Sequence, residues 1–194
     1  MLWEKNPELF KEKYLEGRVL GTNRGQSLGK EIAEALENDT ETGDIVKDLV
    51  LAQIPSYELR DKEIRMMLLG LVTSRGRKTD EDVPLLIKPD SCKADHSAFL
   101  EVKTGLQGTW NQGKVNKDDQ LTFYATGLYI LTGKIPTMEL IHAPTTQDEI
   151  GRPSLTGEIR RYQTSRTWID ISKMKIRMRK AWREIGNMIE SELL

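Results

Sequence analysis

The stretch Leu85–Gly105, "LLIKPDSCKADHSAFLEVKTG", constrains the fold of this chain more than any other part of the sequence. Two apolar runs, "VPLLIKPDSC" and "AFLEVKT", are separated by the polar "KADHS", a pattern that is typical of a β-hairpin. Each run nevertheless carries charge, because Asp90 follows a proline and because Glu101 and Lys103 interrupt the second run. Charged side chains enter core strands only with partners, so these three residues need an explanation.

Side-chain alternation indicates which of these charges can meet. Along a strand, Glu101 and Lys103 point to one face, and Asp90 and Cys92 share a face of the preceding run. A suitable register therefore brings Asp90 beside Glu101, with Lys103 one step along. This group is either a cross-strand ion pair or a site for a hard divalent cation, which offsets the repulsion between two carboxylates. The local pattern leaves both interpretations open.

The rest of the chain predicts a sheet flanked by helices. Helices are expected at 6–17, 27–38, 44–55, 117–133 and 168–194, and further strands at 137–145 and 156–164. The run 62–72 could be a helix or a strand, and its hydrophobicity and its position before a loop favour a strand. This order describes an α/β fold with a mixed central sheet covered by helices. With 194 residues, the chain is expected to form one domain over 1–194.

Composition excludes several classes of protein. Hydrophobic residues make up 38% and charged residues 30%, which predicts a globular protein with no membrane span and no signal peptide. The single cysteine, Cys92, excludes an internal disulfide and a four-cysteine iron–sulfur or zinc site, and we expect a cytoplasmic protein. The net charge of −1 argues against a nucleic-acid coat protein but not against a nuclease, whose acidic ligands offset a local basic surface.

The order and spacing of the charged motifs resemble the PD-(D/E)XK nuclease superfamily, in particular its RecB-like exonuclease branch. Pro89-Asp90 resembles the "PD" motif, Glu101-Val102-Lys103 resembles "(D/E)XK", and Thr104-Gly105 follows as in many RecB-like members. The resemblance covers about Ser27 to Pro144 and implies a restriction-endonuclease-like core.

A second motif of that branch is a helix carrying Gln-x-x-x-Tyr shortly after the lysine. Gln120 and Tyr124 have this spacing and lie one turn apart on one helix face, so that together they can reach the site or DNA. A buried tyrosine with a local hydrogen-bond partner is the alternative explanation of this pair.

The resemblance implies a role for each matching residue. Asp90 and Glu101 would bind Mg²⁺ or Mn²⁺ together with the Val102 carbonyl, and Lys103 would be the catalytic lysine. Gln120 and Tyr124 would complete the catalytic set.

One part of the family pattern is missing. Members carry an acid or a histidine on the first core helix, and this chain has Ala33 near that position. Glu31 and Glu34 are the available substitutes as metal ligands. Helical geometry favours Glu31 and proximity to the motif favours Glu34, and either is equally explained as a solvated helix residue.

A polar loop between the motif strand and the Gln120 helix contains Trp110, Lys114 and Lys117. These residues are candidates for contacting phosphates and stacking a base, and a solvated loop is the alternative.

The sequence as a whole predicts a Mg²⁺-dependent deoxyribonuclease, with exonuclease action favoured, in recombination, repair or phage DNA processing. The alternative is a catalytically silent nuclease fold that binds DNA or protein. DNA is the expected partner. A separate helicase or single-strand annealing protein is a further candidate, no membrane partner is expected, and the oligomeric state stays open.

Overall fold

The computed structural model describes residues 6–14, 24–60, 62–72, 74, 76–78 and 81–192. The elements in chain order are α2 (Pro7–Tyr14), α3 (Arg24–Asn38), α4 (Ile45–Gln53), β1 (Leu59–Arg60), β2 (Ile64–Leu68), β3 (Val83–Ile87), β4 (Ser91–Cys92), β5 (Ala98–Leu106), α5 (Gln112–Val115), α6 (Asp119–Thr132), β6 (Thr137–Gln147), β7 (Pro153–Leu155), β8 (Arg160–Thr164) and α7 (Trp168–Glu192).

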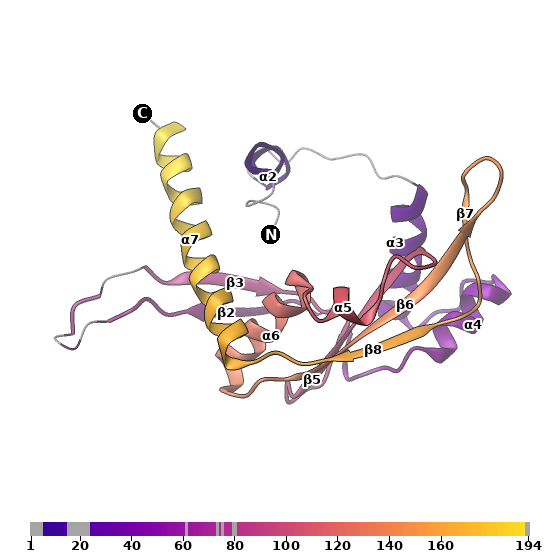
Figure 1. Cartoon of the computed structure of the whole chain (residues 1–194), viewed down its shortest axis with the longest axis horizontal. Coiled ribbons are helices and arrows are strands. Elements are labelled where there is room, and N and C mark those ends of the chain that lie inside the picture. Colours follow the sequence, from indigo (N-terminus) through magenta and orange to yellow (C-terminus); the bar gives the residue numbers. More distant parts are fainter. Residues whose placement is uncertain are drawn as a thin grey trace.

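A mixed sheet of six strands lies at the centre of the described part of the chain (Figure 1). Its order is β1-β4-β5-β6, and β6 then pairs with β8 along its first half and with β7 along its second half. The pair β5–β6 is parallel, and the other pairs of this sheet are antiparallel. Parallel strands need a crossover connection, and the segment with α5 and α6 supplies it.

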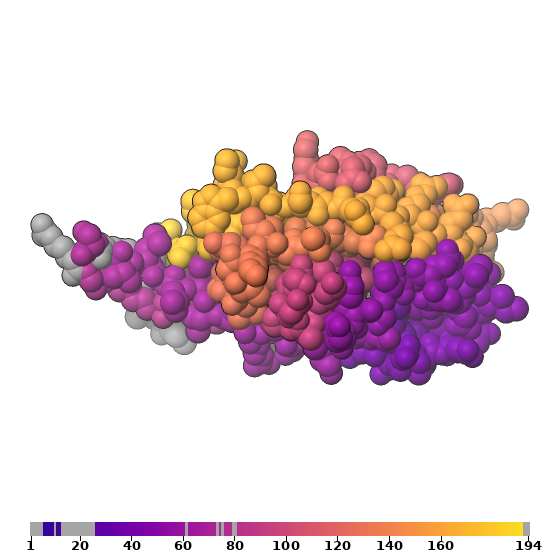
Figure 2. Space-filling view, turned by 90° about the horizontal axis from the view of Figure 1, so that it is seen from below, coloured from indigo at the N-terminus to yellow at the C-terminus, as the bar shows by residue number. Residues whose placement is uncertain are grey.

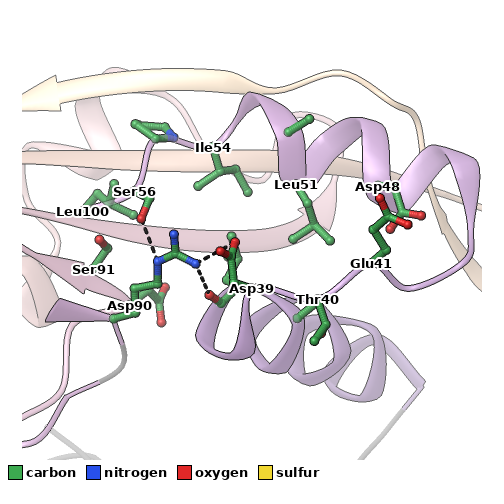
Figure 3. A pocket seen from close by; sticks show the side chains of 15 residues that line it. Asp39, Thr40, Glu41, Asp48, Leu51, Ile54, Ser56, Asp90, Ser91 and Leu100 are labelled. Atoms are coloured by element: carbon green, nitrogen blue, oxygen red, sulfur yellow. Dashed lines mark hydrogen bonds and ion pairs between the residues drawn. The ribbon is translucent and has the colours of Figure 1, made fainter. Parts of the chain in front are cut away.

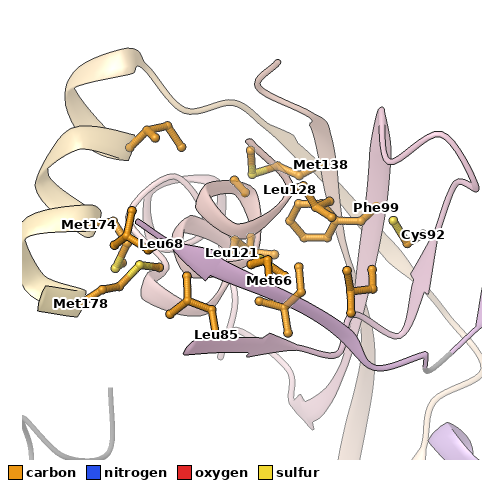
Figure 4. Close-up of a cluster of buried hydrophobic side chains, with 14 of the residues drawn as sticks. Met66, Leu68, Leu85, Cys92, Phe99, Leu121, Leu128, Met138, Met174 and Met178 are labelled. Carbon is orange, nitrogen blue, oxygen red and sulfur yellow. The ribbon is translucent and has the colours of Figure 1, made fainter. Parts of the chain in front are cut away.

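Both faces of the central sheet are covered by apolar side chains. Phe99 of β5 belongs to a buried cluster with residues of α6 and α7, among them Leu121 and Met174 (Figure 4). The next residue, Leu100, points to the opposite face and packs with Ile32 of α3. Complete burial of a side chain of this size contributes about 1.5–3 kcal/mol. The alternation along β5 therefore ties the strand to helices on both faces.

Capping residues define the limits of α6. The carboxylate of Asp118 accepts a hydrogen bond from the Leu121 amide at 2.9 Å, which satisfies one of the free N–H groups of the first turn. The helix ends at Gly133, whose φ of 70° is a left-handed conformation that glycine adopts without strain.

β2 and β3 form a separate antiparallel ribbon that extends away from the central sheet (Figure 1). Burial alternates along both strands: Met66 and Leu85 are buried, and Met67 and Leu86 are exposed. In the space-filling view the ribbon protrudes at the end of the molecule opposite to α3 and α4 (Figure 2).

The predicted α/β fold with a mixed sheet flanked by helices is confirmed. The predicted hairpin is wrong in part. Ser91 and Cys92 pair with Leu100 and Phe99 as expected, but Val83–Ile87 pairs with β2, whose apolar run offers a five-residue partner.

Three short elements, α5, β1 and β7, were not predicted, and the end of the predicted first helix at 15–17 lies outside the described residues. None of the described helices has the length and apolar composition needed to cross a lipid bilayer.

Candidate active site

Asp90 lies where the chain passes from the β2–β3 ribbon into the central sheet. β3 ends at Ile87 and β4 begins at Ser91, so that Pro89 and Asp90 occupy the turn between two sheets. The β4–β5 register ends at the pair Ser91–Leu100, and its continuation puts Asp90 opposite Glu101.

The Asp90 carboxylate also takes the place of a strand partner for β5. Its Oδ2 accepts a hydrogen bond from the Val102 amide at 2.6 Å. The turn between the two sheets is therefore fixed directly onto the backbone of the "(D/E)XK" segment.

Glu101 is a buried carboxylate, with only 3% of the residue exposed. Its Oε1 accepts hydrogen bonds from Lys103 Nζ at 2.5 Å and from Gln120 Nε2 at 2.6 Å. Its Oε2 is buried and has no hydrogen-bond partner within the described residues. Leaving such an oxygen unsatisfied is unfavourable, and a bound cation is one way to satisfy it.

The electrostatics of Glu101 follow from this burial. Burial first, and the neighbouring Asp90 second, raise the pKa of the Glu101 carboxyl from 4.5 to about 8, although Lys103 acts in the opposite direction. A carboxyl group with this pKa is mostly protonated at neutral pH, and additional positive charge beside it would favour the ionised form.

Gln120 and Tyr124 connect Glu101 to the turn that carries Asp90. Gln120 Nε2 donates to Tyr124 Oη at 3.0 Å as well as to Glu101, so both amide hydrogens are used. Tyr124 Oη in turn donates to the Lys88 carbonyl at 2.9 Å. The structure brings Gln120 and Tyr124 together on one face of α6 beside Glu101, and their mutual hydrogen bond is also the local partner of the alternative explanation.

Two hollows lie on either side of Asp90. One, of about 450 Å³, is lined by Asp90, Val102 and Lys103 together with Gly29 and Ala33 of α3.

The other hollow, of about 470 Å³, lies between Asp90 and the end of α3 (Figure 3). There Arg60 contacts Asp39 Oδ1 at 2.9 Å and Ser56 Oγ at 2.7 Å. Asp39 and Arg60 line this hollow together with Asp90, and nothing in their local sequence pattern indicates this.

The structure does not bring Glu31 or Glu34 to the hollow that Asp90, Val102 and Lys103 line. Glu31 Oε1 lies 2.6 Å from Lys47 Nζ, and Glu34 lies 3.4 Å from Lys30. Among the α3 residues that line this hollow, Gly29 and Ala33 carry no ligand atoms on their side chains, whereas Gln26 carries a side-chain amide.

Across the described residues, no group of three or more His, Cys, Asp or Glu side chains is arranged to hold a metal ion. The available oxygen ligands at this site are the two carboxylates and main-chain carbonyls such as that of Val102. This set fits a cation such as Mg²⁺ that keeps several water ligands, and the unsatisfied Glu101 Oε2 is the observation that favours the fit.

The loop after β5 holds Trp110 in a structural position. Its ring packs against the core, and Lys114 Nζ lies 4.2 Å from the ring centroid. The carbonyl of Trp110 accepts a hydrogen bond from Tyr162 Oη at 3.1 Å. Lys114 and Lys117 are exposed and stay candidates for phosphate contacts.

Comparison with known proteins shows a similarity to a solved structure. No protein-family model and no curated protein sequence matches this chain. Among solved structures, it is similar to the crystal structure of a "Putative exonuclease" from Eubacterium rectale, with 14% sequence identity and a TM-score of 0.54. The match covers 95% of this chain and 75% of the other. At this identity the similarity concerns the fold.

Proposed function

We propose that the chain is a metal-dependent nuclease of the RecB-like PD-(D/E)XK type that hydrolyses phosphodiester bonds in DNA. The observation that carries the proposal is the buried Glu101 carboxylate beside Asp90, with one oxygen held by Lys103 and Gln120 and the other unsatisfied. The similarity in fold to the Eubacterium rectale protein supports a nuclease, and the Gln120–Tyr124 motif favours exonuclease action.

The residues present are suited to hold Mg²⁺ or Mn²⁺ through Asp90, Glu101 and the Val102 carbonyl. When bound, such a cation supplies positive charge for the scissile phosphate and lowers the pKa of coordinated water.

The chain's own side chains have distinct tasks in this mechanism. Lys103 would orient the attacking water and, as a cation, stabilise negative charge on the phosphate. The Gln120 side-chain amide donates a hydrogen bond to Glu101 Oε1, so the other carboxylate oxygen, Oε2, does not contact this amide. Tyr124 fixes Gln120 and the Lys88 carbonyl at the start of the Asp90 turn.

Replacement of Lys103 tests this function. With Mg²⁺, wild-type protein is expected to degrade end-labelled linear DNA, and Lys103→Ala to lower the rate by about 10²- to 10⁴-fold, as expected for loss of a positioned acid–base or charge-stabilising group. DNA binding, measured by fluorescence anisotropy, is expected to persist in the variant.

Lys134→Ala is the matched control, since Lys134 is an exposed lysine after the far end of α6. Absence of cleavage of any DNA or RNA by the wild type with either Mg²⁺ or Mn²⁺ would contradict the proposal. DNA binding without any cleavage would support a silent binding module instead.

A further inference from the structure

We infer that Arg166, between β8 and α7, is a positioning residue that sets Gln120 against Glu101. Its effect on turnover rests on the proposed function, whereas its effect on the geometry of Gln120 does not.

Arg166 is a buried cation, with 6% of the residue exposed. Its guanidinium donates from Nε to Thr122 Oγ1 at 2.6 Å, and from Nη2 to the carbonyls of Val115 and Asp118 at 3.1 Å each. Nη1 donates to Thr164 Oγ1 and to the Ser165 carbonyl, both at 2.9 Å. All five N–H donors of a guanidinium can take part in such a network.

The contacts lie on both sides of Gln120 in the sequence. Asp118 precedes Gln120 by two residues and Thr122 follows it by two, and Arg166 bonds to both. The first turn of α6 is therefore held at the level of Gln120, where a helix would otherwise fray.

Residues of β8 and α7 make further contacts with the segment from α5 to the start of α6. Arg177 of α7 forms two hydrogen bonds with the Asp119 carboxylate, at 2.7 and 3.0 Å. Thr164 Oγ1 donates to Asn116 Oδ1 at 3.0 Å, and the Gln163 carbonyl accepts from Gln112 at 2.8 Å. The β8–α7 junction thus fixes the segment from α5 to the first turn of α6.

Small displacements at this point matter for the site. Gln120 Nε2 lies 2.6 Å from Glu101 Oε1 and 3.0 Å from Tyr124 Oη, so a shift of the first turn breaks one contact or both. Glu101 would then keep the hydrogen bond from Lys103, but the plane of the Glu101 carboxylate would be free to rotate. Misplacement of a reacting group by about 1 Å lowers rates by about 10²-fold.

Two arginine variants test the inference. Arg166→Met is expected to lower kcat by about 10- to 100-fold with KM changed less than about twofold. Arg161→Met is the matched control, because Arg161 lies on β8 and pairs with the Glu139 carboxylate at 2.6 and 2.8 Å. That variant also loses stability, but is expected to keep kcat.

A double-mutant cycle separates positioning through Gln120 from general loss of structure. If Arg166 acts through Gln120, then Arg166→Met is expected to cause little further loss of kcat in a Gln120→Ala background. Additive losses would overturn the inference.

A milder pair of variants covers the case in which Arg166→Met fails to fold. Thr122→Val removes the hydroxyl that Arg166 Nε contacts, and Thr126→Val removes a hydroxyl that bonds to the Thr122 carbonyl of its own helix. Thr122→Val is expected to lower kcat and Thr126→Val to leave it unchanged. Equal effects of the two would overturn the inference.

The effect of Arg166 on the position of Gln120 can be measured without an activity assay. In a ¹H–¹⁵N spectrum, the side-chain amide resonances of Gln120 are expected to shift in Arg166→Met, or in Thr122→Val, and to stay in place in Arg161→Met and Thr126→Val. Unchanged Gln120 resonances in the first two variants would overturn the inference, even if wild-type protein cleaves DNA. An inactive wild type with the expected shifts would reject the proposed function and support the positioning role.

Discussion

Glu101 combines three properties that rarely occur together in one carboxylate. It is buried, it lies beside a second carboxylate, and one of its oxygens has no partner in the described part of the chain. Lys103 and Gln120 both contact the other oxygen. Glu101 and Lys103 do form an ion pair, and the unsatisfied Oε2 is the feature that this ion pair alone does not explain.

The raised pKa of Glu101 makes a prediction about stability without metal. The folded-state pKa of about 8 is above the ordinary 4.5, so the folded protein holds the Glu101 proton more tightly than the unfolded chain. The resulting contribution to the free energy of unfolding is fully present below about pH 4.5 and is lost as the pH rises through about 8. In EDTA, wild-type protein is expected to lose on the order of 1–4 kcal/mol relative to Glu101→Gln between pH 5 and pH 9, at about 1.4 kcal/mol per pKa unit.

Urea unfolding of the two proteins across this pH range measures the difference directly. Added Mg²⁺ is expected to restore wild-type stability at pH 9 and to have little effect on Glu101→Gln. Parallel curves for the two proteins in EDTA would show that Glu101 does not titrate as the structure implies.

At the residue scale, the sequence allowed the prediction of the contacts that depend on strand alternation and helical spacing. Asp90 beside Glu101 follows from the first, and Gln120 with Tyr124 from the second. The sequence could not decide between Glu31 and Glu34, because the rotation of α3 about its axis depends on packing that the local pattern does not encode.

The arrangement of α6 connects core packing with the site. Its first turn carries Gln120, and its middle packs against the β2–β3 ribbon through Gly127. A Cβ atom at Gly127 would lie 2.9 Å from Met66 Sδ and 3.1 Å from two carbons of Ile87. Glycine therefore allows helix and ribbon to approach closely without displacement of Met66 or Ile87.

Two helical glycines give a matched test of this packing. Gly127→Ala is expected to destabilise the protein, because overpacking costs about 1–3 kcal/mol and outweighs the helix propensity of alanine, about 1 kcal/mol. Gly186→Ala in α7 has open space around the new Cβ and is expected to stabilise by up to about 1 kcal/mol. Thermal unfolding measures both, and destabilisation of equal size at the two positions would contradict the packing described for α6.

At the scale of elements, the long helices and the strands β5 and β6 could be predicted from periodicity, since each is long enough to show a clear pattern. The strand β2 could be predicted only from its hydrophobicity and its position before a polar loop, with a helix as the alternative. The partner of Val83–Ile87 could not, because the "KADHS" turn made the next run the obvious choice and β2 is separated by a long polar loop. α5, β1 and β7 span two to four residues each, too few for a period to appear.

At the scale of the whole molecule, the candidate site lies at β5, between the helices that cover the two faces of the central sheet. Cluster residues of α6 and α7 pack on one face of β5 and those of α3 and α4 on the other. Asp90 enters from the ribbon side, where β4 ends and leaves part of β5 uncovered. Three separate segments of the chain thus converge on a few oxygen atoms. The order of the motifs indicates this convergence, and the fold brings it about.

The most direct test of the central claim is the location of a divalent cation. In crystals soaked with Mn²⁺, an anomalous difference peak is expected between the carboxylates of Asp90 and Glu101 and within coordination distance, about 2.0–2.3 Å, of their oxygens. The same soak of Glu101→Gln crystals is expected to show a weak peak or none. Mn²⁺ bound elsewhere in wild-type crystals, with no density between Asp90 and Glu101, would contradict the assignment of this site as the metal centre of a nuclease.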